Sequence, residues 1–181
     1  MATDRKTADT RRARAVDAGL RAFADHGMTT AAVQDVAKQI GVSQPYVFRL
    51  FGSKRAFFLA CLDELEARVV AAFSSYDGHA GDLLEEMGAT FRSLVSDGTA
   101  GGFWLQACVA AQSDSEIAAR CRELISDVLR LTSKVADVDA DRLAAFLGRG
   151  ALVTMLQALG VDLAEGSAAA VRQLSVSGTT P

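Results

Sequence analysis

The sequence is poor in the residues that build several common classes of protein. It has only two prolines, three cysteines and two histidines among 181 residues. The cysteines, Cys61, Cys108 and Cys121, are far apart and odd in number, so they do not indicate a disulfide framework. They favour a reducing compartment, and we expect a cytoplasmic protein. No Cys or His pair has zinc spacing, so we expect neither a metal nor another cofactor.

Long apolar runs are also missing. The longest, Leu143 to Val161, is interrupted by Arg149 and Gln157 and fits a core or interface helix better than a membrane span. Residues 1–15 are charged throughout, which is typical of neither a signal peptide nor a span. The sequence therefore predicts no membrane partner.

Paired catalytic groups are absent as well. Glu85 and Glu86 are adjacent in sequence and so do not share one helix face, and Asp139 and Asp141 fit a loop and a helix start. We therefore predict no catalytic residues. An enzyme is kept as an alternative of a different class.

What is present indicates an all-α protein with uneven charge. Alanine is abundant, and no strand-like alternation extends beyond a few residues. Residues 1–60 hold ten Lys and Arg against five Asp, a net charge of +5, whereas residues 61–181 hold nine against seventeen acidic residues, a net charge of -8. A basic N-terminal region on an acidic remainder fits phosphate binding by that region alone. The alternative is a chance fluctuation in solvated charge.

Residues 29–54 carry the most informative pattern, two short helices joined by a tight turn. Gly41 ends the first helix, Ser43 fits the N-cap of the second, and Pro45 is tolerated in the first turn of the second. The first helix has one apolar face with residues at positions i, i+3, i+4 and i+7: Val33, Val36, Ala37 and Ile40. The pattern predicts a helix-turn-helix.

The second helix has an inner and an outer face. Val47, Leu50 and Phe51 form the stripe that must pack inward. The outward residues are Gln44, Pro45, Tyr46 and Arg49. Arg can bind guanine and Gln can bind adenine in a major groove, while Tyr can contact a phosphate or a thymine methyl. The alternative is an ordinary solvated helix face.

The run GVSQPYVFRLFGSK, preceded by DHGMTTAAVQDVA, resembles the DNA-binding domain of the TetR (tetracycline repressor-like) family of bacterial transcriptional regulators. The resemblance covers about residues 10–60. It implies an all-helical homodimer with a three-helix DNA-binding domain at 1–52 and a helical regulatory and dimerisation domain at 53–181. In that family the second motif helix binds operator DNA, and a ligand in the C-terminal domain releases it.

By position, the resemblance also implies a set of DNA-binding residues. Phe48 stands where family members usually carry a tyrosine, so it is left out, and Tyr46 or Arg49 should compensate for the missing hydroxyl. The implied DNA-binding residues are Thr30, Ser43, Gln44, Pro45, Tyr46, Arg49 and Lys54.

Several expectations concern the remaining helices. The first helix should begin near Arg11, and Arg11, Arg12 and Arg14 could reach DNA or simply be a solvated helix start. The glycine-rich stretch 97–102 should be a hinge or turn, and Ser113 and Glu116 should form a capping box. The helices at about 116–135 and 141–159 should pair with their copies in a dimer, or else complete the monomer core.

Apolar residues beyond those that a thin layer of helices needs predict a site for a small apolar or amphipathic ligand. The alternative is ordinary core packing, because aromatic and Met stripes at helical spacing usually pack inside. The candidate ligand-binding residues come from three consecutive segments: Phe73, Met87, Phe91, Trp104 and Cys108.

Together these features predict a sequence-specific DNA-binding transcriptional regulator, a repressor released from a palindromic operator by a small molecule. One alternative is a transcriptional activator of the same fold, and another is a helical small-molecule-binding module without specific DNA readout. A non-specific DNA-compacting protein should be basic throughout, which the acidic C-terminal region argues against.

Overall fold

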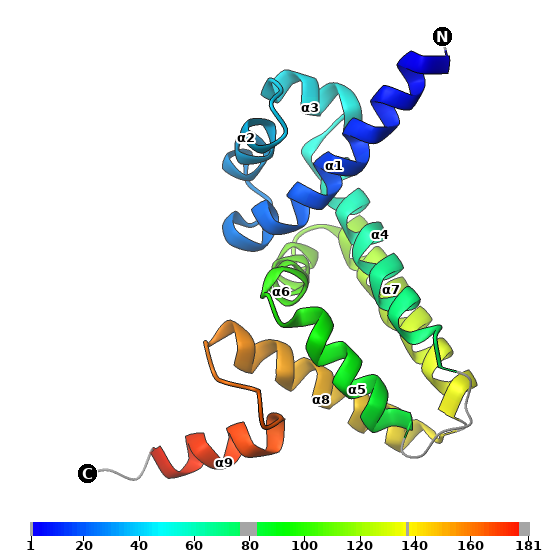
Figure 1. The fold of residues 1–181 in the computed structure, drawn as a ribbon, viewed down its shortest axis with the longest axis vertical. Coiled ribbons are helices and arrows are strands. Elements are labelled where there is room, and N and C mark those ends of the chain that lie inside the picture. Colours follow the sequence, from blue (N-terminus) through cyan, green and yellow to red (C-terminus); the bar gives the residue numbers. More distant parts are fainter. Residues whose placement is uncertain (1, 77–82, 137, 178–181) are drawn as a thin grey trace.

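In the computed structural model, which describes residues 2–76, 83–136 and 138–177, the chain is helical and has no strands within those ranges (Figure 1). The all-α prediction is therefore confirmed. None of the helices in these ranges is long and apolar enough to span a membrane. The described helices are α1 Ala2–His26, α2 Thr30–Gln39, α3 Gln44–Phe51, α4 Lys54–Phe73, α5 Leu83–Val95, α6 Thr99–Ala111, α7 Ser115–Ala136, α8 Ala140–Ala158 and α9 Ser167–Ser177.

Helices α1, α2 and α3 form the N-terminal head, at the top of Figure 1. Thr29 caps α2, because its hydroxyl accepts the Ala32 N–H at 3.3 Å. Gly41, with φ of 70°, provides the left-handed residue of the turn between α2 and α3. Ser53 caps α4 by accepting the Ala56 N–H at 3.0 Å, whereas Ser43 holds the N-cap position of α3 without a side-chain bond. The predicted helix-turn-helix is thus formed.

Helix α1 is longer than predicted, since it begins at Ala2 and not near Arg11. The expected start relied on the density of polar residues. Polarity does not stop a helix whose outer side faces water, and the first glycine of the chain is Gly19. The arginines at 11, 12 and 14 therefore lie in the middle of α1.

The prediction of a hinge or turn at 97–102 holds for Asp97 and Gly98 but not for residues 99–102, which lie in α6. Only Gly98 has a left-handed backbone, with φ of 78°, and Gly101 and Gly102 lie inside the first turn of α6. A Cβ on Gly102 would lie 3.2 Å from the Cβ of Ala24 in α1, and one on Gly101 would lie 3.3 Å from Cγ2 of Thr154 in α8. These glycines therefore allow close packing on two sides of α6.

An aromatic cluster joins the head to the rest of the molecule, which we call the body (α4–α9). The ring centroid of Phe23 in α1 lies 5.1 Å from that of Phe57 and 5.0 Å from that of Phe58, both in α4. The Phe58 ring lies 4.9 Å from Phe103 in α6, and Phe51 of α3 stacks on Phe57 at 4.2 Å. One hydrophobic core thus extends from the head into the body.

Helix α7 begins one residue later than the predicted capping box requires. Asp114, and not Ser113, is the capping residue: its Oδ1 accepts the N–H groups of Glu116 at 3.1 Å and Ile117 at 3.3 Å. Its Oδ2 accepts Nε–H of Arg55 at 2.6 Å. A carboxylate can accept all three bonds at once, which a serine hydroxyl cannot. Asp114 therefore joins the start of α7 to the first turn of α4.

Candidate nucleic-acid interface and ligand cavity

Helix α3 is held with its apolar side against the head. Val47 is fully buried and Phe51 nearly so, while Arg49 and Pro45 are exposed, as the residue spacing predicts. Arg12 of α1 fixes the end of α3: its Nη1 donates to the Leu50 carbonyl at 2.7 Å, and its guanidinium lies 4.3 Å from the Phe51 ring centroid. The outer side of α3 is therefore presented by a fixed scaffold.

Tyr46 lies between two arginines at this surface. The guanidinium carbon of Arg49 lies 4.7 Å from the Tyr46 ring centroid, and that of Arg11 lies 5.6 Å from it. Arg11 Nη1 also donates to the Tyr46 hydroxyl at 3.2 Å. Cation–π contacts of this kind restrict both arginines. We call Arg11, Tyr46 and Arg49 the Arg–Tyr–Arg cluster. The sequence indicated Arg11 only as part of a basic helix start.

The other predicted DNA-binding residues lie at helix starts. Thr30 is the first residue of α2 and is exposed, and Ser43 is exposed just before α3. Gln44 and Lys54 are the first residues of α3 and α4, and both are half-buried. Helix N-termini present unpaired N–H groups and a partial positive charge, which suit phosphates.

Two residues near this surface have other roles. Arg55 pairs with Asp114, and its Nη1 lies 3.8 Å from a Glu116 carboxylate oxygen. Phe48 is half-buried and packs against the hydrophobic core. The tyrosine-to-phenylalanine difference noted at position 48 therefore leaves an apolar side chain that serves packing.

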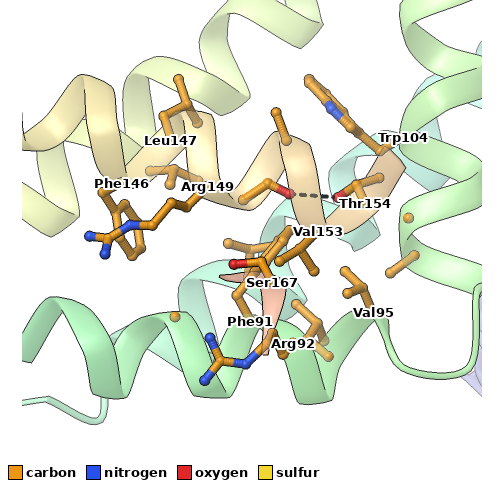
Figure 2. A pocket seen from close by; sticks show the side chains of 18 of the residues that line it. Phe91, Arg92, Val95, Trp104, Phe146, Leu147, Arg149, Val153, Thr154 and Ser167 are labelled. Atoms are coloured by element: carbon orange, nitrogen blue, oxygen red, sulfur yellow. Dashed lines mark hydrogen bonds between the residues drawn. The ribbon is translucent and has the colours of Figure 1, made fainter. Parts of the chain in front are cut away.

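The body forms a cavity of about 660 Å³, lined by residues of α4 to α8, of the segment before α9 and of the start of α9 (Figure 2). Of the five predicted ligand-binding residues, Phe73, Phe91 and Trp104 line it. Other aromatic and aliphatic lining residues are Leu65, Val69, Leu84, Val95, Leu124, Val128, Phe146, Leu147 and Val153.

Met87 and Cys108 do not line the cavity. The side of α5 that faces the cavity is centred on Gly88, and Met87 is turned into the core, where it is fully buried. Cys108 lies one helical turn beyond Trp104 on α6 and is exposed. The helix on which each residue lies could be predicted from the sequence, but not how far the cavity extends along that helix.

Charged residues stand at the rim of the cavity. Arg92 Nη2 lies 3.4 Å from one Glu85 carboxylate oxygen, and Arg149 Nη1 lies 3.9 Å from the other. All three residues line the cavity, as does Glu165. The sequence did not lead us to predict that α8 lines the cavity, although Arg149, which interrupts the longest apolar run, was a signal for it. Within the described ranges, no three His, Cys, Asp or Glu residues are grouped so as to hold a metal ion.

Comparisons with known proteins agree with this arrangement. Residues 15–61 match the family model described as bacterial regulatory proteins, tetR family. The crystal structure of a TetR-like transcriptional regulator from Rhodococcus sp. RHA1 is similar, with a TM-score of 0.63 and 22% sequence identity, over 91% of this chain and 96% of that one. No curated protein matches the sequence. The family model thus covers the helix-turn-helix, and the solved structure shows that the fold is shared over most of the chain.

Proposed function

Because residues 15–61 match the tetR family model, the chain is a DNA-binding transcriptional regulator of the TetR family, and on this premise we propose that it is a repressor that a small-molecule ligand releases from a palindromic operator. The division of function follows the predicted boundary: residues 1–52 bind DNA, and residues 53–181 bind the ligand and form the dimer. The observation that carries the proposal is the Arg–Tyr–Arg cluster, in which Arg11 of α1 and Arg49 of α3 are exposed on either side of Tyr46.

The proposed roles follow from side-chain chemistry. Arg49 is exposed near the end of α3 and supplies the fork that guanine O6 and N7 accept. Tyr46 orients Arg49 through the ring contact, and Arg11 adds a cation beside it. Gln44 and Pro45 complete the base-contacting side. Thr30, Ser43 and Lys54 contact phosphates, which fix position without specifying sequence.

Selection of bound duplexes from random DNA tests this proposal. The expected consensus is an inverted repeat. Arg49→Ala should lose about 1–3 kcal/mol of discrimination at one base pair of each half-site. Lys54→Ala should weaken binding to all sequences and lower the salt slope by about one unit. Ser126→Ala, on the exposed outer side of α7, is the matched control and should bind as wild type does.

Two outcomes would contradict this function. An Arg49→Ala variant that binds its best site as tightly as wild type would show that α3 is not the specificity helix. A selection without any consensus would favour a small-molecule-binding module that lacks specific DNA readout. A reporter gene under the selected operator separates repressor from activator, since deletion of the regulator should raise expression only for a repressor.

The dimer surface that we propose is the outer side of α8 together with α9. The apolar residues of α7, such as Ile117 and Leu124, are buried within the monomer, so the predicted pairing of 116–135 with its copy loses its apolar contact. On α8, Met155 is 49% exposed and Leu159 is 70% exposed. The exposed stripe of α8 is Ala144, Gly148, Ala151, Met155, Ala158 and Leu159, and α9 adds Val171 and Leu174.

Charge placed on either helix tests this surface by sedimentation. Ala151→Glu should dissociate the dimer at micromolar concentration, because a carboxylate would be buried in a close helix contact. Ser126→Glu, on the polar outer side of α7, should leave the dimer intact. If Ser126→Glu dissociated the dimer and Ala151→Glu did not, the interface would lie on α7. A monomeric wild type would contradict any dimer.

Ligand control requires a link from the cavity to the head, and α6 provides one. Gly101 and Trp104 line the cavity, while Gly102 lies against Ala24 of α1. A ligand that shifts α6 therefore also moves α1, in addition to any tilt that the ligand causes in α4. Such a ligand weakens DNA binding by at most its affinity ratio for the two states.

A further inference from the structure

We propose that the cavity selects an amphipathic carboxylate, with an apolar body inside the cavity and a carboxylate group bound by Arg92 and Arg149. The proposal rests on the ligand-controlled function above, because it names the ligand class of the same cavity. It depends on three features: an apolar interior, a pair of converging guanidinium groups, and an internal carboxylate that occupies the position between them.

The interior of the cavity offers few polar groups: among its lining residues, Thr154 of α8 and Ser167 of α9 carry hydroxyl groups. Its walls are aromatic and aliphatic, with Phe91, Trp104, Phe146 and Val153 among them. The Thr154 hydroxyl donates to the Gly150 carbonyl of its own helix at 3.0 Å, so this donor is already used. Ligand cavities commonly measure about 300–1,000 Å³ and are mostly apolar with a few converging polar groups. The volume of about 660 Å³ lies within that range.

The polar groups converge at one end. In the view of Figure 2, the guanidinium groups of Arg149, at the left, and Arg92, at the bottom, both lie far from Trp104 at the upper right. The Arg92 side chain is 29% exposed and that of Arg149 is 54% exposed. Both approach the carboxylate of Glu85, from α5 and α8 respectively. Each guanidinium group lies within 4 Å of a different Glu85 oxygen, so a carboxylate at this position has a cation on either side. The planar forks of guanidinium groups match carboxylate geometry.

The Glu85 carboxylate interacts only weakly with the two guanidinium groups. Its oxygens lie 3.4 Å from Arg92 and 3.9 Å from Arg149. Strong bonds between a guanidinium and a carboxylate measure about 2.7–2.9 Å. Two positive charges share one negative charge, so the three residues carry a net charge of +1. A ligand carboxylate can therefore bind here with shorter bonds, in competition with Glu85.

A cationic ligand fits this rim less well. It would place its charge beside two guanidinium groups, and Glu85 is already paired with both. Glu165 is the other acidic lining residue and is exposed on the segment between α8 and α9. Its carboxylate alone would have to neutralise the ligand, in contact with water, where an ion pair contributes little.

Fluorescence of Trp104, the single tryptophan of the chain, tests the ligand class without DNA. The probes are decanoate, decanol and decylamine, which share one chain length. Decanoate and decylamine are used below their micelle concentrations, and decanol below its solubility limit. Decanoate should bind the wild type about tenfold more tightly than either of the other two. The double variant Arg92→Gln/Arg149→Gln should lose this preference and still bind decanol, which shows that its cavity is intact.

Glu85→Gln is the variant that best separates the proposed role of Glu85 from a structural one. Removing the internal competitor should tighten decanoate binding several-fold and leave decanol binding unchanged. A purely structural role of Glu85 predicts the opposite, weaker binding of both. Arg122→Gln, on the exposed outer side of α7, is the matched control for loss of an arginine and should retain the wild-type preference.

Equal binding of decanoate and decanol, tighter binding of decylamine, or weaker decanoate binding by Glu85→Gln would each overturn the proposal. Operator binding, measured by anisotropy on the same samples, separates it from the regulatory function. Decanoate bound with the expected preferences but without release of DNA leaves the ligand class standing and refutes release by this class. A specific operator combined with no carboxylate preference refutes the ligand class alone.

Discussion

The head and the body are built from the same kind of helix, yet one is filled and the other is hollow. Where α1 of the head packs on α4, the rings of Phe23 and Phe57 lie 5.1 Å apart, and a Cβ on Gly19 would lie only 2.8 Å from the Cys61 sulfur. The body keeps about 660 Å³ open between its helices. A filled region presents side chains in one arrangement. A hollow one has room to change when a ligand enters.

The difference does not make them independent. Helix α6 of the body connects the two, because Phe103 is part of the aromatic cluster that contacts the head and Trp104, the next residue, lines the cavity. A filled head that shares core residues with a hollow body should unfold with it in one transition. The comparison therefore concerns local packing within one folding unit.

The largest expected effect is that of Phe103→Ala. Phe103 is fully buried against Phe23 and Phe58, and loss of a buried aromatic ring costs about 3–5 kcal/mol. Denaturant unfolding should show a single transition that is shifted by this amount. Two separate transitions would show that head and body unfold independently.

Phe91→Ala measures the corresponding cost of losing a ring from the cavity wall. Phe91 is half-buried on the cavity wall, so its ring has packing partners on fewer sides. It should destabilise the protein by less than half as much as Phe103→Ala, because the cavity can grow without losing a filled contact. Equal costs of the two variants would mean that the cavity wall is as tightly packed as the head.

The next effect concerns two glycines inside helices. Gly19→Ala should destabilise the protein by about 1–3 kcal/mol, because the new methyl group overlaps the Phe57 ring and the Cys61 sulfur, both at 2.8 Å. Gly88→Ala, on the cavity side of α5, should stabilise it by about 0.5–1 kcal/mol, since the nearest atom is 3.7 Å away and alanine favours a helix. Thermal unfolding measures both. A stabilising Gly19→Ala would contradict the filled head.

The sequence predicted what depends on neighbours along the chain. The apolar spacing of α2 and α3, the turn at Gly41 and the position of Ser43 just before α3 are local, and each was found as expected. Phe73, Phe91 and Trp104 were placed on inner helix faces, and they do line the cavity.

What could not be predicted depends on neighbours in space. The hydrogen bond between Arg11 and Tyr46 joins residues 35 positions apart, and the sequence of neither segment predicts it. Whether Gly102 is a hinge or a close contact is decided by Ala24 on another helix. Met87 and Phe91 share a helix face by spacing, yet only the surrounding helices determine that Phe91 borders the cavity and Met87 the core.

The smallest expected effect concerns Asp114, which joins the first turn of α4, next to the head, to α7. Burial alone would raise the pKa of Asp114, but the hydrogen bond from the Ile117 N–H and the Arg55 guanidinium outweigh it, so the pKa lies below its ordinary value. A lowered pKa means that the charged form stabilises the folded state at pH values above the unfolded pKa. This stabilisation is lost as the pH falls through the folded pKa.

Asp114→Asn keeps an acceptor oxygen for the cap but removes the charge. The free energy of unfolding of the wild type should therefore exceed that of the variant at neutral pH, and the difference should shrink below about pH 4, where the wild-type carboxyl is protonated in the unfolded chain and then in the folded one. In an Arg55→Gln background the difference at neutral pH should be smaller, because the cation that favours the carboxylate is gone. A difference that stays constant from neutral pH to about pH 3 would show that Asp114 acts through its shape alone. The contact between the first turn of α4 and the start of α7 would then not depend on the charge of Asp114.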